Sequence, residues 1–125
     1  MLYIIGKGAL MGKAYWYTTD SGRSPVEEDI NDLSMPDQAK IYAYIKKLEE
    51  FGYRLGVPFV KPLEGKIKEL RIPVSPGQYR IFFFFHYRED FYLLHGFLKK
   101  TQKTPPKEID VARKRMKSIL ISIGG

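Results

Sequence analysis

Four consecutive phenylalanines, Phe82 to Phe85, constrain the fold of this chain more than any other feature. They lie in a run of aromatic and β-branched residues over 78–87, a composition that is typical of a β-strand. Successive side chains of a strand point to opposite faces of the sheet, so four apolar residues in a row make both faces apolar. The run therefore predicts a central strand.

The segments around this strand indicate an α+β domain. Arg88-Glu89-Asp90 predicts a tight, charged hairpin turn after it, and the residues of 73–77 predict another turn before it. The resulting fold is a strand and a helical hairpin packed on an antiparallel sheet that ends in a three-strand meander and a final helix. The other expected elements are a strand over 14–18, helices over 25–33 and 36–51, strands over 67–72 and 91–98, and a helix from Pro106.

The length of 125 residues fits one domain over 1–125. The chain has no cysteine, which excludes disulfides and cysteine-based metal sites and permits a cytoplasmic location. No apolar run reaches the roughly 18 residues of a membrane helix, so we expect no membrane association. Two histidines without a carboxylate cluster are poor metal ligands, and we expect neither a metal nor another cofactor.

The positive charge is concentrated near the C-terminus. The formal net charge is +7, and nearly all of the excess follows residue 98. A local cationic surface is a stronger sign of nucleic-acid binding than a high overall charge. The alternative is a basic helix whose charges are simply solvated.

Two arginines within predicted strands are the main candidates for chemistry. Alternation places Arg80 on one face with Phe82 and Phe84, and it places Arg71 with Glu69. If Arg71, Arg80 and Lys99 converge, they form a cationic concavity in which planar guanidinium groups match phosphate oxygens. The alternative is that each arginine forms a salt bridge, with Glu64 or Glu69 as the partner.

His95 has an ordinary pKa suited to proton transfer, but it lies in a mostly apolar strand. Alternation places it on one face with Phe91, Leu93 and Phe97, so a satisfied core histidine is the competing interpretation. Most aromatic residues are expected in the core, although Tyr79 or Phe97 is a candidate to stack on an RNA base beside the cations.

Several of these segments together resemble a known family. They are Glu69-Leu70-Arg71, Tyr79-Arg80-Ile81, and the stretch over 93–105 that reads LLHGFLKKTQKTP and leads into a helix at Lys107-Glu108-Ile109. The combination resembles the phage-derived Gp49-like and HigB-like group of the RelE toxin superfamily over about residues 14–117. Residues 1–10 have no counterpart in it, and they are interpreted as a leader before a start at Met11 or as an added strand.

The resemblance implies a RelE-like toxin of a type II toxin–antitoxin system. Such a toxin is a metal-free endoribonuclease that cuts mRNA in the ribosomal A site, and its partner is a helix-turn-helix antitoxin. The attacking group is the RNA 2′-hydroxyl, which DNA lacks. The implied catalytic residues are Arg71, Arg80, Lys99 and His95, and the implied RNA-binding residues are Lys66, Lys68, Lys100 and Lys103.

The chain departs from the family in one respect. Many members carry a tyrosine or histidine near the C-terminus for proton transfer, whereas here no tyrosine follows Tyr92 and no histidine follows His95. Proton transfer then falls to His95 or to a lysine with a lowered pKa. The alternatives are a non-catalytic module that binds RNA or the ribosome, and a phage-derived interaction protein.

Overall fold

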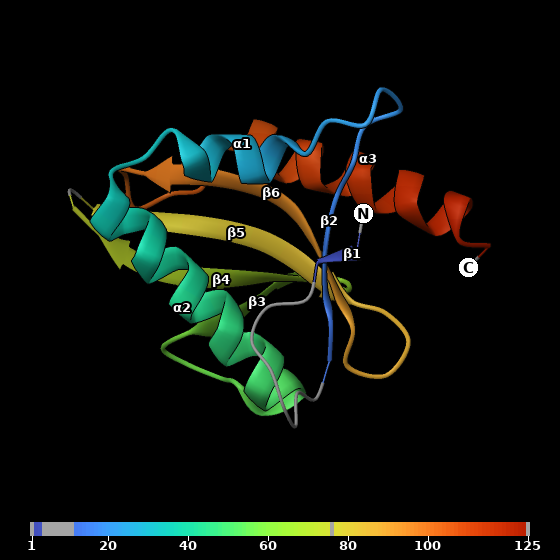
Figure 1. Ribbon diagram of the computed structural model, residues 1–125, viewed down its shortest axis with the longest axis horizontal. Coiled ribbons are helices and arrows are strands. Elements are labelled where there is room, and N and C mark those ends of the chain that lie inside the picture. The colour runs from blue at the N-terminus through green and yellow to red at the C-terminus, as the bar shows by residue number, and fades with distance from the viewer. Residues whose placement is uncertain (1, 4–11, 76, 125) are drawn as a thin grey trace.

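The computed structural model describes residues 2–3, 12–75 and 77–124. Within these residues, six strands and three α-helices follow one another along the chain (Figure 1). No helix in this part of the chain is both long enough and apolar enough to cross a membrane. The elements are β1 (Leu2–Tyr3), β2 (Ala14–Trp16), α1 (Pro25–Asn31), α2 (Met35–Phe51), the 3₁₀ helix η1 (Gly52–Arg54), β3 (Val60–Glu64), β4 (Ile67–Val74), β5 (Gly77–Phe85), β6 (Phe91–Lys99) and α3 (Pro106–Ser122).

The strands form one sheet in the order β1-β2-β6-β5-β4-β3. The phenylalanine run lies in β5, between β6 and β4, which confirms the prediction of a central strand. The expected meander is present, and β3 extends it to four antiparallel strands. Strand β3 was not predicted from the sequence, because Pro62 and the exposed Lys61 interrupt the alternation of apolar residues. Proline and lysine are typical of an edge strand.

The prediction of a purely antiparallel sheet is wrong. Strand β2 runs parallel to β6, with Ala14 beside Phe91 and Trp16 beside Leu93. A parallel pair requires a long connection, and here the chain passes through α1, α2 and the other strands of the meander before it returns as β6. Of residues 1–10, only Leu2–Tyr3 lies within the described part, as β1, so the choice between leader and added strand stays open.

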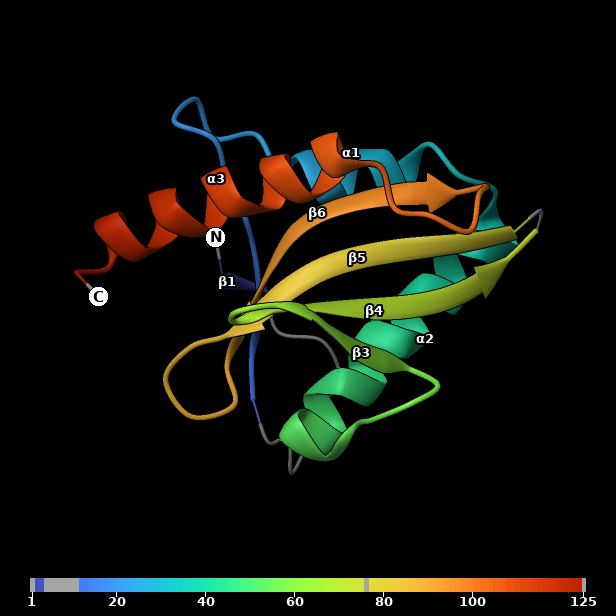
Figure 2. The same ribbon diagram turned by 180° about the vertical axis from the view of Figure 1, so that it is seen from behind.

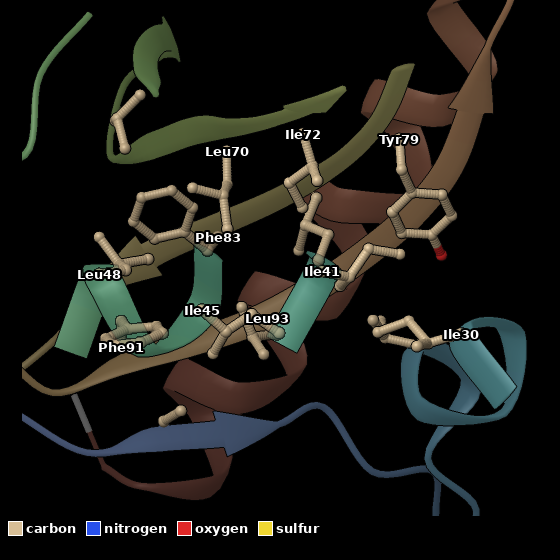
Figure 3. Close-up of a cluster of buried hydrophobic side chains, with 14 of the residues drawn as sticks. Ile30, Ile41, Ile45, Leu48, Leu70, Ile72, Tyr79, Phe83, Phe91 and Leu93 are labelled. Atoms are coloured by element: carbon tan, nitrogen blue, oxygen red, sulfur yellow. The ribbon is translucent and has the colours of Figure 1, made fainter. Parts of the chain in front are cut away.

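Helices α1 and α2 cover one face of the sheet (Figure 1). The expected apolar stripe of α2 is buried, with Ile41, Ile45 and Leu48 fully inaccessible. Figure 3 shows these side chains between α2 and the sheet, together with Leu70 and Phe83 from the strands. Burial of this cluster fixes the helical hairpin on the sheet, because the hydrophobic effect favours removal of that apolar area from water.

Helix α3 covers only part of the opposite face. It packs against β6 and β5 and buries Ala112 and Ile119 against Phe82 and Phe84. Viewed from behind, β4 and β3 lie beside the helix rather than beneath it (Figure 2). The charged residues of β4 and β5 can therefore meet solvent on this face.

A β-bulge in β6 changes which side chains share a face. Phe82 pairs with His95 but Phe83 pairs with Leu93, so Leu94 is an extra residue in β6. As a result, Leu93 packs in the cluster under α1 and α2, whereas Leu94 and Phe97 pack in the cluster under α3. The prediction of one shared face for Phe91, Leu93, His95 and Phe97 is wrong, because strict alternation does not hold across a bulge.

Candidate functional site

A cavity of about 770 Å³ opens on the α3 side of the sheet, where the helix leaves the strands uncovered. Its floor comes from β3, β4, β5 and the end of β6, and the loop between β6 and α3 forms one wall. We call it the cationic pocket. Its lining residues are Lys61, Pro62, Leu63, Glu69, Arg71, Gly77, Gln78, Arg80, Lys99, Lys100, Thr101, Gln102 and Thr104.

The register of the sheet brings the predicted cations together. Arg71 on β4 lies directly opposite Arg80 on β5, and Lys99 on β6 lies opposite Gln78, two pairs further along. Side chains opposite one another on antiparallel strands are about 4.5–5.5 Å apart at Cβ, and diagonal neighbours remain within reach of long side chains. The structure thus brings together Arg71, Arg80 and Lys99.

Arg80 is held in place by two acceptors. Its Nη1 lies 2.7 Å from Oε2 of Glu69, and both side chains are almost fully buried. Its Nε donates to Oε1 of Gln78 at 3.0 Å, and its Nη2 donates to the same oxygen. The salt-bridge alternative is therefore correct for Arg80 with Glu69, whereas Glu64 pairs instead with Arg113 on α3. These contacts orient the guanidinium at the pocket floor.

Within the described part of the chain, Arg71 differs from Arg80 in having no such acceptor. Its Nε is buried and, among the described residues, has no hydrogen-bond partner. A buried donor without an acceptor is costly, because burial removes its hydrogen bond to water. An anionic ligand in the pocket would supply the missing acceptor.

The electrostatics of Lys99 reflect the same shortage of anions. Partial burial lowers the pKa of Lys99, and the positive charges of Arg80 and Arg71 lower it further, while Glu69 opposes them. Lys61 adds to the effect from the far strand. Five cations (Lys61, Arg71, Arg80, Lys99 and Lys100) thus surround one carboxylate, which favours a ligand with several negative oxygens, such as a phosphodiester.

His95 is not among the residues that line the cationic pocket. Its Nε2 lies 2.7 Å from Oε1 of Glu108 in the first turn of α3, and its ring stacks on Phe97. It lines a smaller cavity of about 200 Å³ between α1 and α3. The pairing with Glu108 places His95 where it secures the beginning of α3.

The two aromatic residues expected to stack on RNA are core residues. Tyr79 is fully buried and its hydroxyl donates to Asp29 on α1, while burial and this hydrogen bond raise its pKa. Phe97 is 9% exposed and packs edge-on against Phe82. Neither ring lines the cationic pocket, so the predicted stacking is wrong for both.

Of the four lysines predicted to bind RNA, Lys100 lines the pocket. Lys66 is exposed in the turn between β3 and β4, and Lys103 is exposed in the loop before α3, but neither lines the cavity. Lys68 alternates with Glu69 along β4 and therefore lies on the other face. The structure does not bring these three lysines to the site.

Sequence reasoning missed several of the lining residues, among them Lys61 and Gln78. Lys61 lies in the unrecognised edge strand β3, opposite Glu69. Gln78 could have been found, because it lies two residues before Arg80 in a predicted strand and so shares its face. Among the residues that the structure describes, no group of three His, Asp or Glu side chains is placed to hold a metal ion.

Comparison with known proteins gives one finding on the family. The model of the family described as phage derived protein Gp49-like (DUF891) matches residues 28–117, which is more than half of the chain. The matched segment runs from α1 through most of α3 and contains every residue of the cationic pocket. A search of curated proteins found no match.

Proposed function

This chain belongs to the phage-derived Gp49-like family, part of the RelE and HigB toxin-like group, and we propose that it is the toxin of a type II toxin–antitoxin system. We further propose that it has a RelE-like fold and that it cleaves mRNA in the ribosomal A site without a metal ion. Its partner on this proposal is a helix-turn-helix antitoxin, and its place of action is the cytoplasm.

The observation that carries the proposal is the cationic pocket, above all Nε of Arg71, which has no hydrogen-bond partner among the described residues and lies beside the fixed guanidinium of Arg80. Two arginines opposite one another on a sheet repel each other unless an anion lies between them. A phosphodiester fits this requirement, because guanidinium groups match its oxygens two at a time.

The same geometry supports RNA cleavage. The 2′-hydroxyl loses its proton to water as its oxygen attacks the neighbouring phosphorus, the bond from phosphorus to the 5′-oxygen breaks, and negative charge on the phosphate oxygens increases in the transition state. Arg80 is already oriented by Glu69 and Gln78, so it stabilises this charge without reorganisation. Lys99, whose pKa is lowered, is our candidate to give a proton to the departing 5′-oxygen.

One observation favours a second candidate function. Among the residues that the structure describes, no histidine or tyrosine lines the cationic pocket to accept the proton of the 2′-hydroxyl, and the one carboxylate there, Glu69, is paired with Arg80. A protein with this pocket can bind RNA or the ribosome and block translation without cutting. The two functions differ in whether new mRNA ends appear.

Controlled expression in bacteria separates these functions. Growth is followed together with primer extension on a reporter mRNA, for the wild type, Arg71→Lys and Arg71→Ala. Arg71 is preferred to Arg80 because loss of Arg80 would leave Glu69 buried without its partner. The matched control is Lys46→Ala, which removes an exposed cation on α2, on the other face of the sheet.

A nuclease gives growth arrest and new in-frame 5′ ends, and both disappear in the two Arg71 variants but persist in Lys46→Ala. Growth arrest without new mRNA ends would favour the second function, in which the protein binds RNA or the ribosome without cutting. New ends that persist in Arg71→Ala would contradict the assigned site.

A further inference from the structure

A second, smaller cavity adjoins the cationic pocket. It has a volume of about 160 Å³ and lies at the edge of β4, beside the residues that precede the start of β3. We call it the aromatic subsite, and it is lined by Tyr44, Pro58, Phe59, Arg71, Pro73 and Gln78. Arg71 and Gln78 also line the cationic pocket, so the two cavities share a wall.

The aromatic rings of the subsite are held rigidly. Tyr44 and Phe59 are both partly buried against the core, with ring centroids 5.6 Å apart in an edge-on arrangement. The backbone oxygen of Phe59 accepts a hydrogen bond from the backbone N–H of Arg71 at 2.8 Å, which ties the ring to the arginine strand. Nζ of Lys47 lies 5.2 Å from the Phe59 ring centroid and adds a cation beside it.

Gln78 supplies a polar group at the shared wall. Its Oε1 accepts from Arg80, which turns the amide oxygen toward the arginine. In the part of the chain that the structure describes, its amide nitrogen has no hydrogen-bond partner, so two N–H donors are left at the edge of the subsite. A carbonyl oxygen or ring nitrogen of a ligand can accept from them.

We propose that the aromatic subsite binds one nucleobase of an RNA strand whose adjacent phosphate lies in the cationic pocket. The proposal rests on the function proposed above and adds a base-recognition site to it. The subsite is well below the roughly 300–1,000 Å³ of cavities that hold drug-sized ligands, so it fits a single ring system and not a whole nucleotide.

The chemistry of the subsite matches an unpaired base. Single-stranded RNA is recognised by stacking of splayed bases on aromatic side chains and arginine planes, and every base has a face that can stack. Phe59 and Tyr44 provide the rings, Arg71 connects base and phosphate, and Gln78 donates to an acceptor on the base edge. Stacking without full edge recognition gives a preference among bases rather than a strict sequence requirement.

The test is a binding measurement with uncleavable RNA. Purified protein is titrated with fluorescent 2′-O-methyl RNA hexanucleotides, in which each position in turn is made abasic, and anisotropy reports the affinity. In the wild type we expect one abasic position to weaken binding about tenfold, in line with the loss of one base stacked on an aromatic side chain. The same position should have no effect in Phe59→Leu, which keeps an apolar side chain but removes the ring.

The matched control is Phe51→Leu. Phe51 is also aromatic and also has Lys47 over its ring, but it is exposed and does not line the subsite. This variant should retain the wild-type affinity and the tenfold abasic effect. Circular dichroism establishes that each variant is folded, and the abasic series on the wild type needs no variant at all.

The outcomes separate this proposal from the proposed function. Suppose that the wild type binds the intact RNA with an affinity that falls with salt. If no abasic position then weakens binding, or if Phe59→Leu keeps the abasic effect, the proposed subsite is refuted, whereas phosphate binding in the cationic pocket is still supported. If the wild type does not bind RNA, the proposed function fails and the subsite fails with it.

Discussion

The buried carboxylate in the cationic pocket gives the sharpest test of the site. Glu69 lies 2.7 Å from the guanidinium of Arg80, and the two side chains are only 5% and 6% exposed. Glu69→Gln keeps the shape of the side chain and an acceptor oxygen, but it removes the only negative charge among the described residues that line the pocket. The variant therefore leaves Arg80 buried among other cations.

The expected loss of stability follows from this burial. Removal of one partner of a buried ion pair costs about 3–5 kcal/mol, and we take about 3 because glutamine still accepts a hydrogen bond. Unfolding entropy is about 2.1 cal/mol/K per residue, which for 125 residues gives about 0.26 kcal/mol/K. The melting temperature of Glu69→Gln should accordingly fall by about 11 °C.

Thermal unfolding followed by circular dichroism measures this loss, and Glu64→Gln is the matched control. Glu64 also pairs with an arginine, Arg113, but that pair lies on the surface, where water screens it, so its melting temperature should stay close to that of the wild type. Sulfate should recover more stability in Glu69→Gln than in the wild type, because an anion that binds only the folded state stabilises it. Equal losses in the two variants, or no gain from sulfate, would refute the reasoning.

Two further predictions concern the pocket and the core. The pKa of Lys99, measured by NMR of its Nζ, should lie below the ordinary 10.5, and Glu69→Gln should lower this pKa further. Between the lowered pKa and 10.5 the unfolded chain binds more protons than the folded protein, so the stability that Lys99 contributes rises with pH in that range. A pKa above 10.5 would contradict the balance of charges described for the pocket. Gly96→Ala should lower the free energy of unfolding, measured in urea, by about 2 kcal/mol, because the new Cβ would lie 2.9 Å from ring carbons of the buried Tyr79. In the control Gly56→Ala the new Cβ would meet nothing within 4 Å, so the free energy of unfolding should not change. Equal effects of the two substitutions would count against the steric explanation.

Most of the elements could be predicted because they have local signals in the sequence. The phenylalanine run specified a central strand, and the three- and four-residue spacing of Ile41, Ile45 and Leu48 specified a buried helix face, and both predictions are correct. The edge strand β3 had no such signal, and the parallel pairing of β2 with β6 depends on residues distant in sequence. Local patterns do not encode either feature.

The site was predictable only in part for the same reason. Arg71 and Arg80 were recognisable as charges within strands, but their convergence depends on a register that the sequence does not specify. His95 lies on the same face of the sheet as Arg80, because it pairs with Phe82, but its side chain contacts Glu108 on α3 there and does not line the pocket. The packing of α3 on the sheet, which depends on residues distant in sequence, therefore separates His95 from the pocket.

The parallel contact between β2 and β6 has a consequence for how the molecule is assembled. Beside this contact the backbone N–H of Lys13 donates a hydrogen bond to Asp90, a residue 77 positions further along the chain. By contrast, β3, β4, β5 and β6 each pair with a strand that is adjacent in sequence. Closing a long loop is slow, so we expect the meander to fold first and β2 to dock last. Pulse-labelled hydrogen exchange would then show late protection of the Tyr17 amide, which donates to Leu93. During synthesis, β2 emerges early but can dock only after β6 has left the ribosome, so unfinished chains keep that edge of the sheet open.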